Sequence, residues 1–484
     1  MPSSARRDRV GGPDLGHLPG LRVLAMAVVS IALVGLSGGV AGGTARGRTL
    51  WFAAYDGPAN GLDAAEGIAA SPDGSKVFVT GESWGGSTDF DSATIAYDAA
   101  TGVRLWTARY NGPANGADSS QGEIAVSPDG SKVFVDAQSW GGSTGEDGAT
   151  IAYDANSGSQ LWATRFNGRA NGDDYVYQIA VSPDGARVFA TGSTPGRSGD
   201  DDTATAAYDV NTGAQVWFAR YSGPDGLDDD AFAIGAAPDG SRVYVTGVSQ
   251  SATTAFDILT IAYRASTGRR ARVSRYDGPD SLDDFATDLG VAPDGSKVYV
   301  TGYSVGASTA RDTETIAYDA RTGAEAWESR YDGPDSLDDD GVRLAVSLDG
   351  SRVYVAGVST SATTGDDWTT LSYDAATGDQ LWLSGYHGDG AGADHAWAIG
   401  VSPDGSRVYV NGFTWLDATQ YDYMTIAYDS ASGAVAWKQR TGGGGSDFSY
   451  LLAVDPTGAR VYVSGESDSG ASGTLDFLTL AYTP

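Results

Sequence analysis

Aspartates recur at two fixed places along this chain of 484 residues, and paired carboxylates are groups that could bind a cation. One series opens a string of the form Asp-x-x-Thr-apolar-small-Tyr, and its members are Asp91, Asp147, Asp202, Asp257, Asp312, Asp367, Asp422 and Asp476. The other series comprises Asp63, Asp118, Asp174, Asp229, Asp284, Asp339, Asp394 and Asp447. Oxygen-rich groups of this kind suit Ca²⁺. We take Asp284, Asp312, Asp339 and Asp367 as the candidate metal ligands.

A structural role competes with cation binding for the same aspartates. An Asp side chain commonly accepts backbone N–H hydrogen bonds within its own loop. Recurrence in every repeat favours this role, because a single cation site would need only a few of these carboxylates.

Aromatic residues in the same segments break the repetition. They are Trp84, Trp140, Trp368, Trp415 and Tyr421. Exposed Trp beside carboxylates and Gly/Ser/Thr loops would suit sugar rings, whose apolar faces stack on aromatics. Such residues also serve as local packing anchors. The sequence leaves both roles open.

A cluster of arginines is the sharpest local departure from the repeat. Five arginines fall between Arg264 and Arg275, in a protein with a formal net charge of −31. They could dock an acidic partner or a glycan. Neutral drift on an exposed outer strand would produce the same pattern.

Several kinds of chemistry are excluded or disfavoured by composition. The chain has no cysteine, so it has no disulfide, thiolate metal site or cysteine nucleophile, and its three histidines argue against a multi-histidine metal centre. No Gly-x-Ser-x-Gly nucleophile elbow lies between a strand and a helix. Carboxylate pairs could serve glycoside hydrolysis, but with so many acidic residues chance pairs are plentiful. The negative charge disfavours nucleic acid and anionic membranes as partners.

The spacing of the Asp-x-x-Thr string, 54 to 56 residues, shows eight copies of one unit. Residues 284–331 illustrate the unit. Short alternating segments at 286–292, 296–302, 312–319 and 324–331 are separated by Pro-Asp-Gly, by a longer loop and by Arg-Thr-Gly. This pattern predicts four antiparallel strands. Eight such blades predict an all-β, eight-bladed β-propeller.

The two ends of the repeat array are complementary. Residues 51–55 form an outer strand with no blade before it, and the chain stops at a third strand, 480–482, with no fourth strand after it. Pairing of the N-terminal strand with the last blade would remove an open sheet edge. We therefore expect a ring closed in this way.

The residues also resemble a known family. The run from Ala96 to Trp106 matches the tryptophan-docking motif Ala-x-Asp-x-x-x-Gly-x-x-x-Trp of pyrroloquinoline-quinone-type propellers. The segment from Asp338 to Gly357 also resembles the β-propeller repeat of secreted bacterial proteins. The resemblance implies that an outer-strand Trp packs against the next blade at Trp106, Trp162, Trp217, Trp327, Trp382 and Trp437. In blade 4, Arg264 replaces the motif's Asp and Arg272 its Trp. Quinone binding is disfavoured, because many quinone-dependent members carry a cysteine-pair ring.

The N-terminal segment, residues 1–48, reads as an export signal or a membrane anchor, with residues 49–484 as one propeller domain. Arginines precede an apolar run from Leu21 to about Val40, and small residues follow. Without this segment the chain has 25 basic and 60 acidic residues and a formal charge of −35. We expect an extracellular or cell-surface protein, with membrane contact only through an uncleaved segment.

These observations predict an exported, non-catalytic, monomeric scaffold that binds an extracellular protein or glycan through its acidic loops, with Ca²⁺ as a candidate ion. The alternative is an enzyme, either a degenerate quinoprotein dehydrogenase or a carbohydrate-active one.

Overall fold

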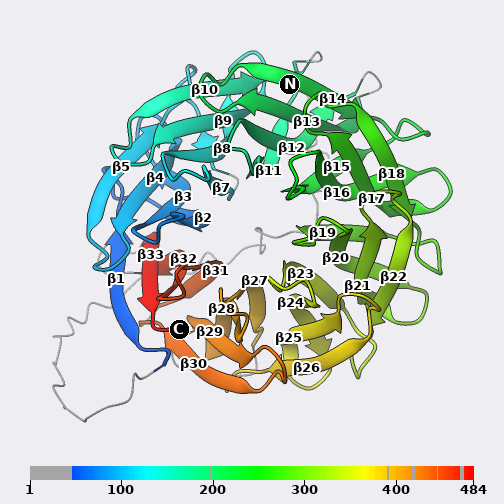
Figure 1. Cartoon of the computed structure of the whole chain (residues 1–484). Coiled ribbons are helices and arrows are strands. Elements are labelled where there is room, and N and C mark those ends of the chain that lie inside the picture. Colours follow the sequence, from blue (N-terminus) through cyan, green and yellow to red (C-terminus); the bar gives the residue numbers. More distant parts are fainter. Residues whose placement is uncertain are drawn as a thin grey trace, which may run out of the picture.

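The chain folds into eight antiparallel sheets that are arranged as blades around a central axis (Figure 1). The computed structural model describes residues 46–484 except 121, 169–170, 197–198, 390–391, 417–419, 444 and 469–473. All regular elements in this part of the chain are strands, which confirms the predicted eight-bladed propeller. A search of the same residues finds no helix that is long and apolar enough to span a membrane.

The first four blades run from Asp63 to Tyr276, each with its first strand nearest the axis and its fourth strand outermost. Blade 1 comprises β2 (Asp63–Ala70), β3 (Lys76–Trp84), β4 (Phe90–Asp98) and β5 (Arg104–Tyr110). Blade 2 comprises β6 (Asp118–Ser119), β7 (Ile124–Val126), β8 (Lys132–Trp140), β9 (Glu146–Asp154) and β10 (Gln160–Phe166). Blade 3 comprises β11 (Tyr175–Val181), β12 (Arg187–Pro195), β13 (Asp201–Asp209) and β14 (Gln215–Tyr221). Blade 4 comprises β15 (Asp229–Ala236), β16 (Arg242–Ser251), β17 (Ala255–Arg264) and β18 (Arg270–Tyr276).

The other four blades complete the ring. Blade 5 comprises β19 (Asp284–Val291), β20 (Lys297–Gly306), β21 (Ala310–Asp319) and β22 (Glu325–Tyr331). Blade 6 comprises β23 (Asp339–Val346), β24 (Arg352–Ser361), β25 (Gly365–Asp374) and β26 (Gln380–Tyr386). Blade 7 comprises β27 (His395–Val401), β28 (Arg407–Leu416), β29 (Gln420–Asp429) and β30 (Val435–Thr441). Blade 8 comprises β31 (Asp447–Val454), β32 (Val461–Asp468), β33 (Leu475–Tyr482) and β1 (Thr49–Tyr55).

Blade 2 departs from the others on its innermost strand. The interval from Asp118 to Ser127 is one residue longer than the matching interval from Asp63 to Ser71 in blade 1. The extra residue interrupts the ladder, so this strand is split into β6 and β7, which both pair with β8. The split places Glu123 immediately before β7.

Buried tryptophans wedge neighbouring blades together. Trp327 of blade 5 is 7% exposed, and its Nε1–H donates to the backbone oxygen of Ala375 in blade 6 at 3.1 Å. Its ring lies between Tyr299 of its own blade and Tyr373 of the next, with centroids 5.8 and 6.3 Å away. Equivalent indole hydrogen bonds are made by Trp106, Trp162, Trp217 and Trp382. These five junctions are thus filled by an aromatic side chain whose one polar atom is satisfied.

The ring is closed as expected from the complementary chain ends. Strand β1 pairs with β33, with Trp51 opposite Ala481, and the Trp51 indole donates to Ala99 in blade 1 at 3.0 Å (Figure 1). The backbone N–H of Gly47 donates to the oxygen of Thr483 at 3.1 Å, and that of Thr483 donates to Arg48 at 2.9 Å.

These bonds add Gly47 and Arg48 to the propeller, slightly before the expected boundary at residue 49. The rest of the predicted leader, residues 1–45, lies outside the described residues. Trp437 wedges against the closing turn, and its Nε1 has no hydrogen-bond acceptor among the residues that the structure describes.

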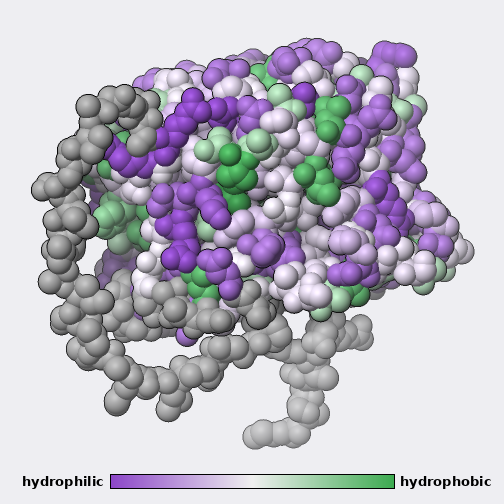
Figure 2. Space-filling model, turned by 90° about the horizontal axis from the view of Figure 1, so that it is seen from below, coloured by the Kyte–Doolittle hydropathy of each residue, from purple (hydrophilic) through white to green (hydrophobic). Residues whose placement is uncertain are grey.

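The outer wall of the ring is largely hydrophilic. Figure 2 shows one side of it, where hydrophobic residues form separate small patches among hydrophilic ones. Exposed large hydrophobic side chains lie mainly on outermost strands, as with Leu105, Leu161 and Leu381. Singly scattered residues of this kind are normal on a soluble protein surface and mark no interface.

Candidate functional site on the loop face

The loop face carries the loops that lead into the innermost strands and those that join second to third strands. Both Asp series lie on it. The first series, which we call the lead-in Asp residues, is buried in every blade. The carboxylate of Asp284 accepts the backbone N–H of Gly278 at 2.6 Å, and that of Asp339 accepts the N–H of Gly333 at 2.7 Å. The same bond recurs at Asp63, Asp118, Asp174, Asp229, Asp394 and Asp447.

These bonds hold the connection between consecutive blades in place. The lead-in Asp residues thus have the structural role of accepting backbone N–H bonds in their own loops. Burial raises the pKa of Asp284 to about 6, although hydrogen bonds from Ser304 and Gly278 oppose this rise. A buried carboxylate that is already bonded in this way is costly to expose, and one of its two oxygens is already engaged.

The second series, on the third strands, is mostly neutralised by arginine. Asp312 pairs with Arg330 of the adjacent outermost strand at 2.6 Å, and Asp91 pairs with Arg109 at 2.9 Å. The same pairing occurs at Asp147, Asp202, Asp257 and Asp422. In blades 6 and 8 the arginine position is occupied by Gly385 and Ala54. Asp367 instead accepts a hydrogen bond from the Thr364 hydroxyl at 2.5 Å.

Three junctions bring three carboxylates together within 4.8 Å. The groups are Asp257 with Asp277 and Asp284, Asp312 with Asp332 and Asp339, and Asp56 with Asp63 and Asp476. Of the predicted metal ligands, Asp312 and Asp339 thus share one group and Asp284 belongs to another. Asp367 belongs to no such group among the described residues.

The third member of each group, Asp56, Asp277 or Asp332, belongs to neither of the two Asp series. It is the Asp of a Tyr-Asp-Gly-Pro run, which occurs at 55–58, 276–279 and 331–334. The other blades have Asn, Ser, His or Gly at this position, so the run itself marks the three junctions where a carboxylate triad forms.

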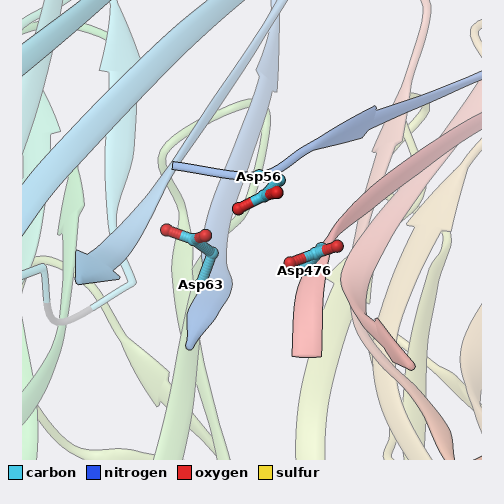
Figure 3. Close-up of side chains that lie close together, drawn as sticks. All are labelled: Asp56, Asp63 and Asp476. Carbon is cyan, nitrogen blue, oxygen red and sulfur yellow. The ribbon is translucent and has the colours of Figure 1, made fainter. Parts of the chain in front are cut away.

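One triad differs in charge from the other two. Asp56 follows β1, Asp63 lies on β2 and Asp476 on β33, and their side chains face one another across the closing junction (Figure 3). Arg275 and Arg330 pair with Asp257 and Asp312 in the other triads. At the closing junction Ala54 stands where that arginine would be. This triad has the best carboxylate arrangement for a cation.

The predicted loop aromatics have different environments. Trp140 is 40% exposed and Trp84 is half-buried, in edge contact with Phe90. Both pack on a glycine of the loop that leads into their blade, since a Cβ on Gly61 or Gly116 would lie 2.4 Å from the indole. Packing is thus at least part of their role, and their contact with a ligand stays a prediction.

The expectation that Trp368 is exposed is wrong. It is 1% exposed, and its Nε1–H donates to the oxygen of Phe413 in blade 7 at 3.2 Å. The residue after the Asp of the repeat string is buried in all eight blades, so Trp368 occupies a core position of its strand. It cannot stack on a ligand at the loop face.

Trp415 and Tyr421 belong to a larger group of aromatic side chains at blades 7 and 8. We call it the aromatic cluster, and its members are His395, Trp397, Phe413, Trp415, Tyr421, Phe448 and Tyr450. Ring centroids are 4.8 Å apart for Trp415 and Tyr421, and 4.9 Å apart for Tyr421 and Phe448. All members except Phe413 are partly exposed. The sequence pattern pointed only to Trp415 and Tyr421. The other five members come from two neighbouring repeats, and only the packing of blade 7 on blade 8 brings them together.

A cavity of about 210 Å³ lies at the axis, beside this cluster. Its lining includes Glu66, Glu123, Asp288, Arg343, Trp397 and Tyr450. Desolvation raises the pKa of Glu123 to about 7, although a hydrogen bond from Gln178 opposes the rise. Burial, with the charges of Glu82, Asp136 and Glu466, raises the pKa of Glu66 well above its usual value. The cavity therefore favours protonated carboxyl groups near neutral pH.

The axial cavity does not fit pyrroloquinoline quinone, the cofactor that the resembling family suggests. That molecule carries three carboxylates. Among the described lining residues, Arg343 is the single cation and it faces three carboxyl groups, Glu66, Glu123 and Asp288. One arginine that already faces three carboxyl groups cannot neutralise three further carboxylates, so this lining does not fit the cofactor.

Comparison with known proteins agrees with the propeller fold. The model of a protein family described as outer membrane protein assembly factor BamB matches residues 37–315 and 311–471. A lanthanide-dependent methanol dehydrogenase from Methylacidiphilum fumariolicum (strain SolV) is 37% identical over 79 residues. That match covers 16% of this chain and only 12% of the enzyme's length.

Two solved structures are similar over most of the chain. BamB from Moraxella catarrhalis has a TM-score of 0.50 and 17% identity, and the match covers 90% of this chain and 99% of that one. Sqt1 from Chaetomium thermophilum, solved bound to the N-terminus of the ribosomal protein L10, has a TM-score of 0.59 and 14% identity, with 90% and 100% covered. At such identities the likeness shows the fold alone.

Proposed function

Because this chain belongs to the BamB-like family of pyrroloquinoline-quinone-type propellers, we propose that it is a non-catalytic scaffold that binds a segment of a partner protein on its loop face. The observation that carries this proposal is the aromatic cluster. It is the largest departure from the repeat on that face, and partly exposed Trp and Tyr side chains are the residues that most often dominate binding energy at protein interfaces.

The chemistry of the partner segment follows from the charge around the cluster. The chain has a net charge of −31, and Asp366 approaches the cluster through His395 at 3.3 Å. A segment that places an aliphatic or aromatic side chain on Tyr421 and a Lys or Arg beside it would match both features. Sqt1, a propeller of similar architecture, was solved with the N-terminus of another protein bound.

The absence of catalysis in this proposal is supported by the environment of the carboxylates. Six third-strand Asp residues pair with arginine, and the lead-in Asp residues accept backbone N–H bonds. These groups are committed to structure. The alternative is an enzyme, either a degenerate quinoprotein dehydrogenase or a carbohydrate-active one, and it would have to use the axial cavity.

A panel of displayed random peptides tests the proposal directly. We expect enriched peptides that combine Lys or Arg with an aromatic or aliphatic residue. Their binding should weaken at least about tenfold, or about 1.4 kcal/mol, in Tyr421→Ser and in Trp415→Ser. Leu337→Ser is the matched control, because it removes an exposed hydrophobic side chain from the loop that leads into blade 6 on the same face. Enrichment of no peptide, or equal loss in all three variants, would contradict the proposal.

Two further arms separate the alternatives. Saturable binding of a neutral oligosaccharide that is lost in Tyr421→Ser would make the ligand a glycan. Dye-linked alcohol oxidation after addition of pyrroloquinoline quinone and Ca²⁺ or a lanthanide would make the protein a dehydrogenase. We expect neither result.

A second candidate function, Ca²⁺ binding, is favoured at the Asp56–Asp63–Asp476 triad, where Ala54 replaces the neutralising arginine.

We also propose that the protein is exported to the cell surface or beyond. This rests on residues 1–48, and fractionation of producing cells with an antibody against the propeller would test it.

A further inference from the structure

The arginine cluster of blade 4 forms a pocket at the outer edge of the ring. We call it the arginine pocket. It has a volume of about 410 Å³ and is lined by Ser241, Arg242, Arg264, Arg269, Arg270, Ala271 and Arg272. Two of the five arginines, Arg264 and Arg272, stand where no other described blade has a basic residue. The volume falls in the range of about 300–1,000 Å³ that is usual for small-molecule sites.

The wedge between blades is missing beside this pocket. Arg272 occupies the position of the docking tryptophan, and its Nε–H donates to the oxygen of Thr322 at 3.1 Å. The oxygen of Ala320, which a tryptophan would also bind, accepts hydrogen bonds from Arg242 and from the Tyr244 hydroxyl, as the oxygen of Ser430 does from Arg352 and Tyr354 beside Trp382. The junction keeps its polar contacts but loses the bulk of an indole.

The strand pairing at this pocket is electrostatically unfavourable. Arg242 lies directly opposite Arg264. In the matching pairs of blades 1, 2, 3, 5, 6 and 7, a Lys or Arg lies opposite Asp. In blade 7, for example, Arg407 and Asp429 form an ion pair of 3.3 Å. Like charges directly opposite one another destabilise a sheet.

No carboxylate relieves this repulsion. None of the five guanidinium groups forms an ion pair with a carboxylate that the structure describes, although the chain has 62 acidic residues. Arg270 lies over the ring of Tyr221 at 5.1 Å, and Arg264, Arg269 and Arg272 are exposed. Arg270 thus turns toward blade 3, whereas Arg242 and Arg272 reach the backbone of blade 5, and the guanidinium hydrogens that these contacts do not use can bind a ligand.

We propose that the arginine pocket binds an oxyanion, a phosphate or sulfate group, carried by a larger ligand. Guanidinium groups bind such groups through paired, charge-assisted hydrogen bonds. A dianion would remove the repulsion between Arg242 and Arg264, and the rest of the ligand would fill the volume left by the missing indole. The pocket is at the outer edge of blade 4, remote from the aromatic cluster of blades 7 and 8, so this inference stands apart from the proposed function.

The test is calorimetric titration of the purified chain with inorganic phosphate and with sulfate, against chloride at matched ionic strength. We expect saturable binding of the two oxyanions and none of chloride. Arg264→Asp restores the repeat's opposite-charge pair, and Arg272→Trp restores the wedge. Each should weaken binding at least about tenfold, as expected for loss of one charge-assisted contact of about 1.4 kcal/mol or more. Both variants restore the repeat and should therefore fold.

Arg104→Gln is the matched control, because Arg104 occupies in blade 1 the position of Arg270 in blade 4. Binding should be unchanged in this variant. Absence of saturable binding, or equal weakening in Arg104→Gln, would overturn the proposal, because either result would reduce the interaction to general screening.

Two larger probes distinguish the sources of the oxyanion. Glucose 6-phosphate represents a phosphate ester and a sulfated disaccharide represents a sulfate ester. We expect one of them to bind more tightly than its free anion, with the difference lost in Arg272→Trp. An acidic peptide rich in Glu that outcompetes both would overturn the oxyanion assignment in favour of a protein partner.

Discussion

The junctions of blade 5 with blade 4 and with blade 6 are built from the same repeat and differ at their outer edge. On the loop face both carry a carboxylate triad with one paired arginine, Arg275 or Arg330. At the outer edge, Trp327 fills the junction of blades 5 and 6, whereas Arg272 stands at the wedge position of blade 4, beside the arginine pocket. The two junctions thus share their loop-face architecture and differ in the wedge, which is an indole at one junction and a cation at the other.

The largest effect should come from opening a junction completely. Deletion of Leu50 to Asp56 removes β1, exposes the edge of β33 and takes away the Trp51 wedge. We expect the whole ring to lose stability, with a lower melting temperature than any single variant below. Thermal unfolding followed by circular dichroism measures this. A truncated chain that melts like the intact one would show that closure contributes nothing.

Removal of one wedge should have the next largest effect. Trp327→Ala should lower the free energy of unfolding by about 3–5 kcal/mol, because it leaves a cavity and removes the indole hydrogen bond to Ala375. Arg272→Ala is the control at the equivalent, exposed position and should change stability by less than about 0.5 kcal/mol. Denaturant titration compares the two variants. Similar losses of unfolding free energy in both would mean that Trp327 and Arg272 contribute equally to their junctions, and would contradict the comparison of the two junctions.

The reverse substitution sharpens the same comparison. Arg272→Trp should raise the free energy of unfolding by about 1 kcal/mol, because it adds aromatic contacts and fills the pocket. Arg104→Trp, on an exposed strand edge, should be neutral. A destabilised Arg272→Trp variant would indicate that the junction has repacked around the arginine.

The wedge architecture could be predicted from the repeat, but the carboxylate triads could not. The Trp residues stand at a fixed distance from a turn motif, and a 55-residue period forces each into an equivalent place. A triad forms where an Asp follows the fourth strand. Its charge depends on whether the residue of the fourth strand beside the third-strand Asp is Arg, as at Arg330, or Ala, as at Ala54. These are contacts between blades, and the sequence of one repeat does not display them.

The wrong prediction for Trp368 and the unpredicted split of the first strand of blade 2 both had a signal in the sequence. Trp368 directly follows the repeat's Asp, and strand alternation places that position in the core. The extra residue at Glu123 can be read from the interval between Asp118 and Ser127. By contrast, the raised pKa of Glu123 arises from desolvation at the axis, where distant repeats converge, so no local pattern announces it.

A pH titration separates the junctions from the axis. Glu123 has a pKa of about 7 in the folded protein against an ordinary value of 4.5, so the folded state binds its proton more tightly. The stability from this proton is complete below about pH 4.5 and is lost as pH rises through about 7. We expect the free energy of unfolding to fall between pH 5 and pH 8, and to fall less steeply in Glu123→Gln. Glu328→Gln, on an exposed site, is the control, and an unchanged slope in Glu123→Gln would contradict this account. The Trp327→Ala loss should be the same at both pH values.

The smallest effect is expected from Ca²⁺. At millimolar concentration it should raise the melting temperature in a saturable way, and more than Mg²⁺ at matched ionic strength. The increase should disappear in Asp56→Asn and persist in Asp277→Asn, the equivalent residue of a triad that contains an Asp–Arg pair. An increase that follows ionic strength alone, or that Asp277→Asn removes equally, would assign it to general screening.

The contact that closes the ring also constrains its biosynthesis. Arg48 and Thr483 bond across a separation of 435 residues. At roughly 5–20 residues per second, β1 leaves the ribosome about 20–90 s before its partner strand exists. During that interval β1, with Trp51 and Phe52, has no partner strand. Seven blades can form and stack, but the ring cannot close. Late, long-range closure of this kind slows folding, so the ring should complete its fold later than its locally paired hairpins form.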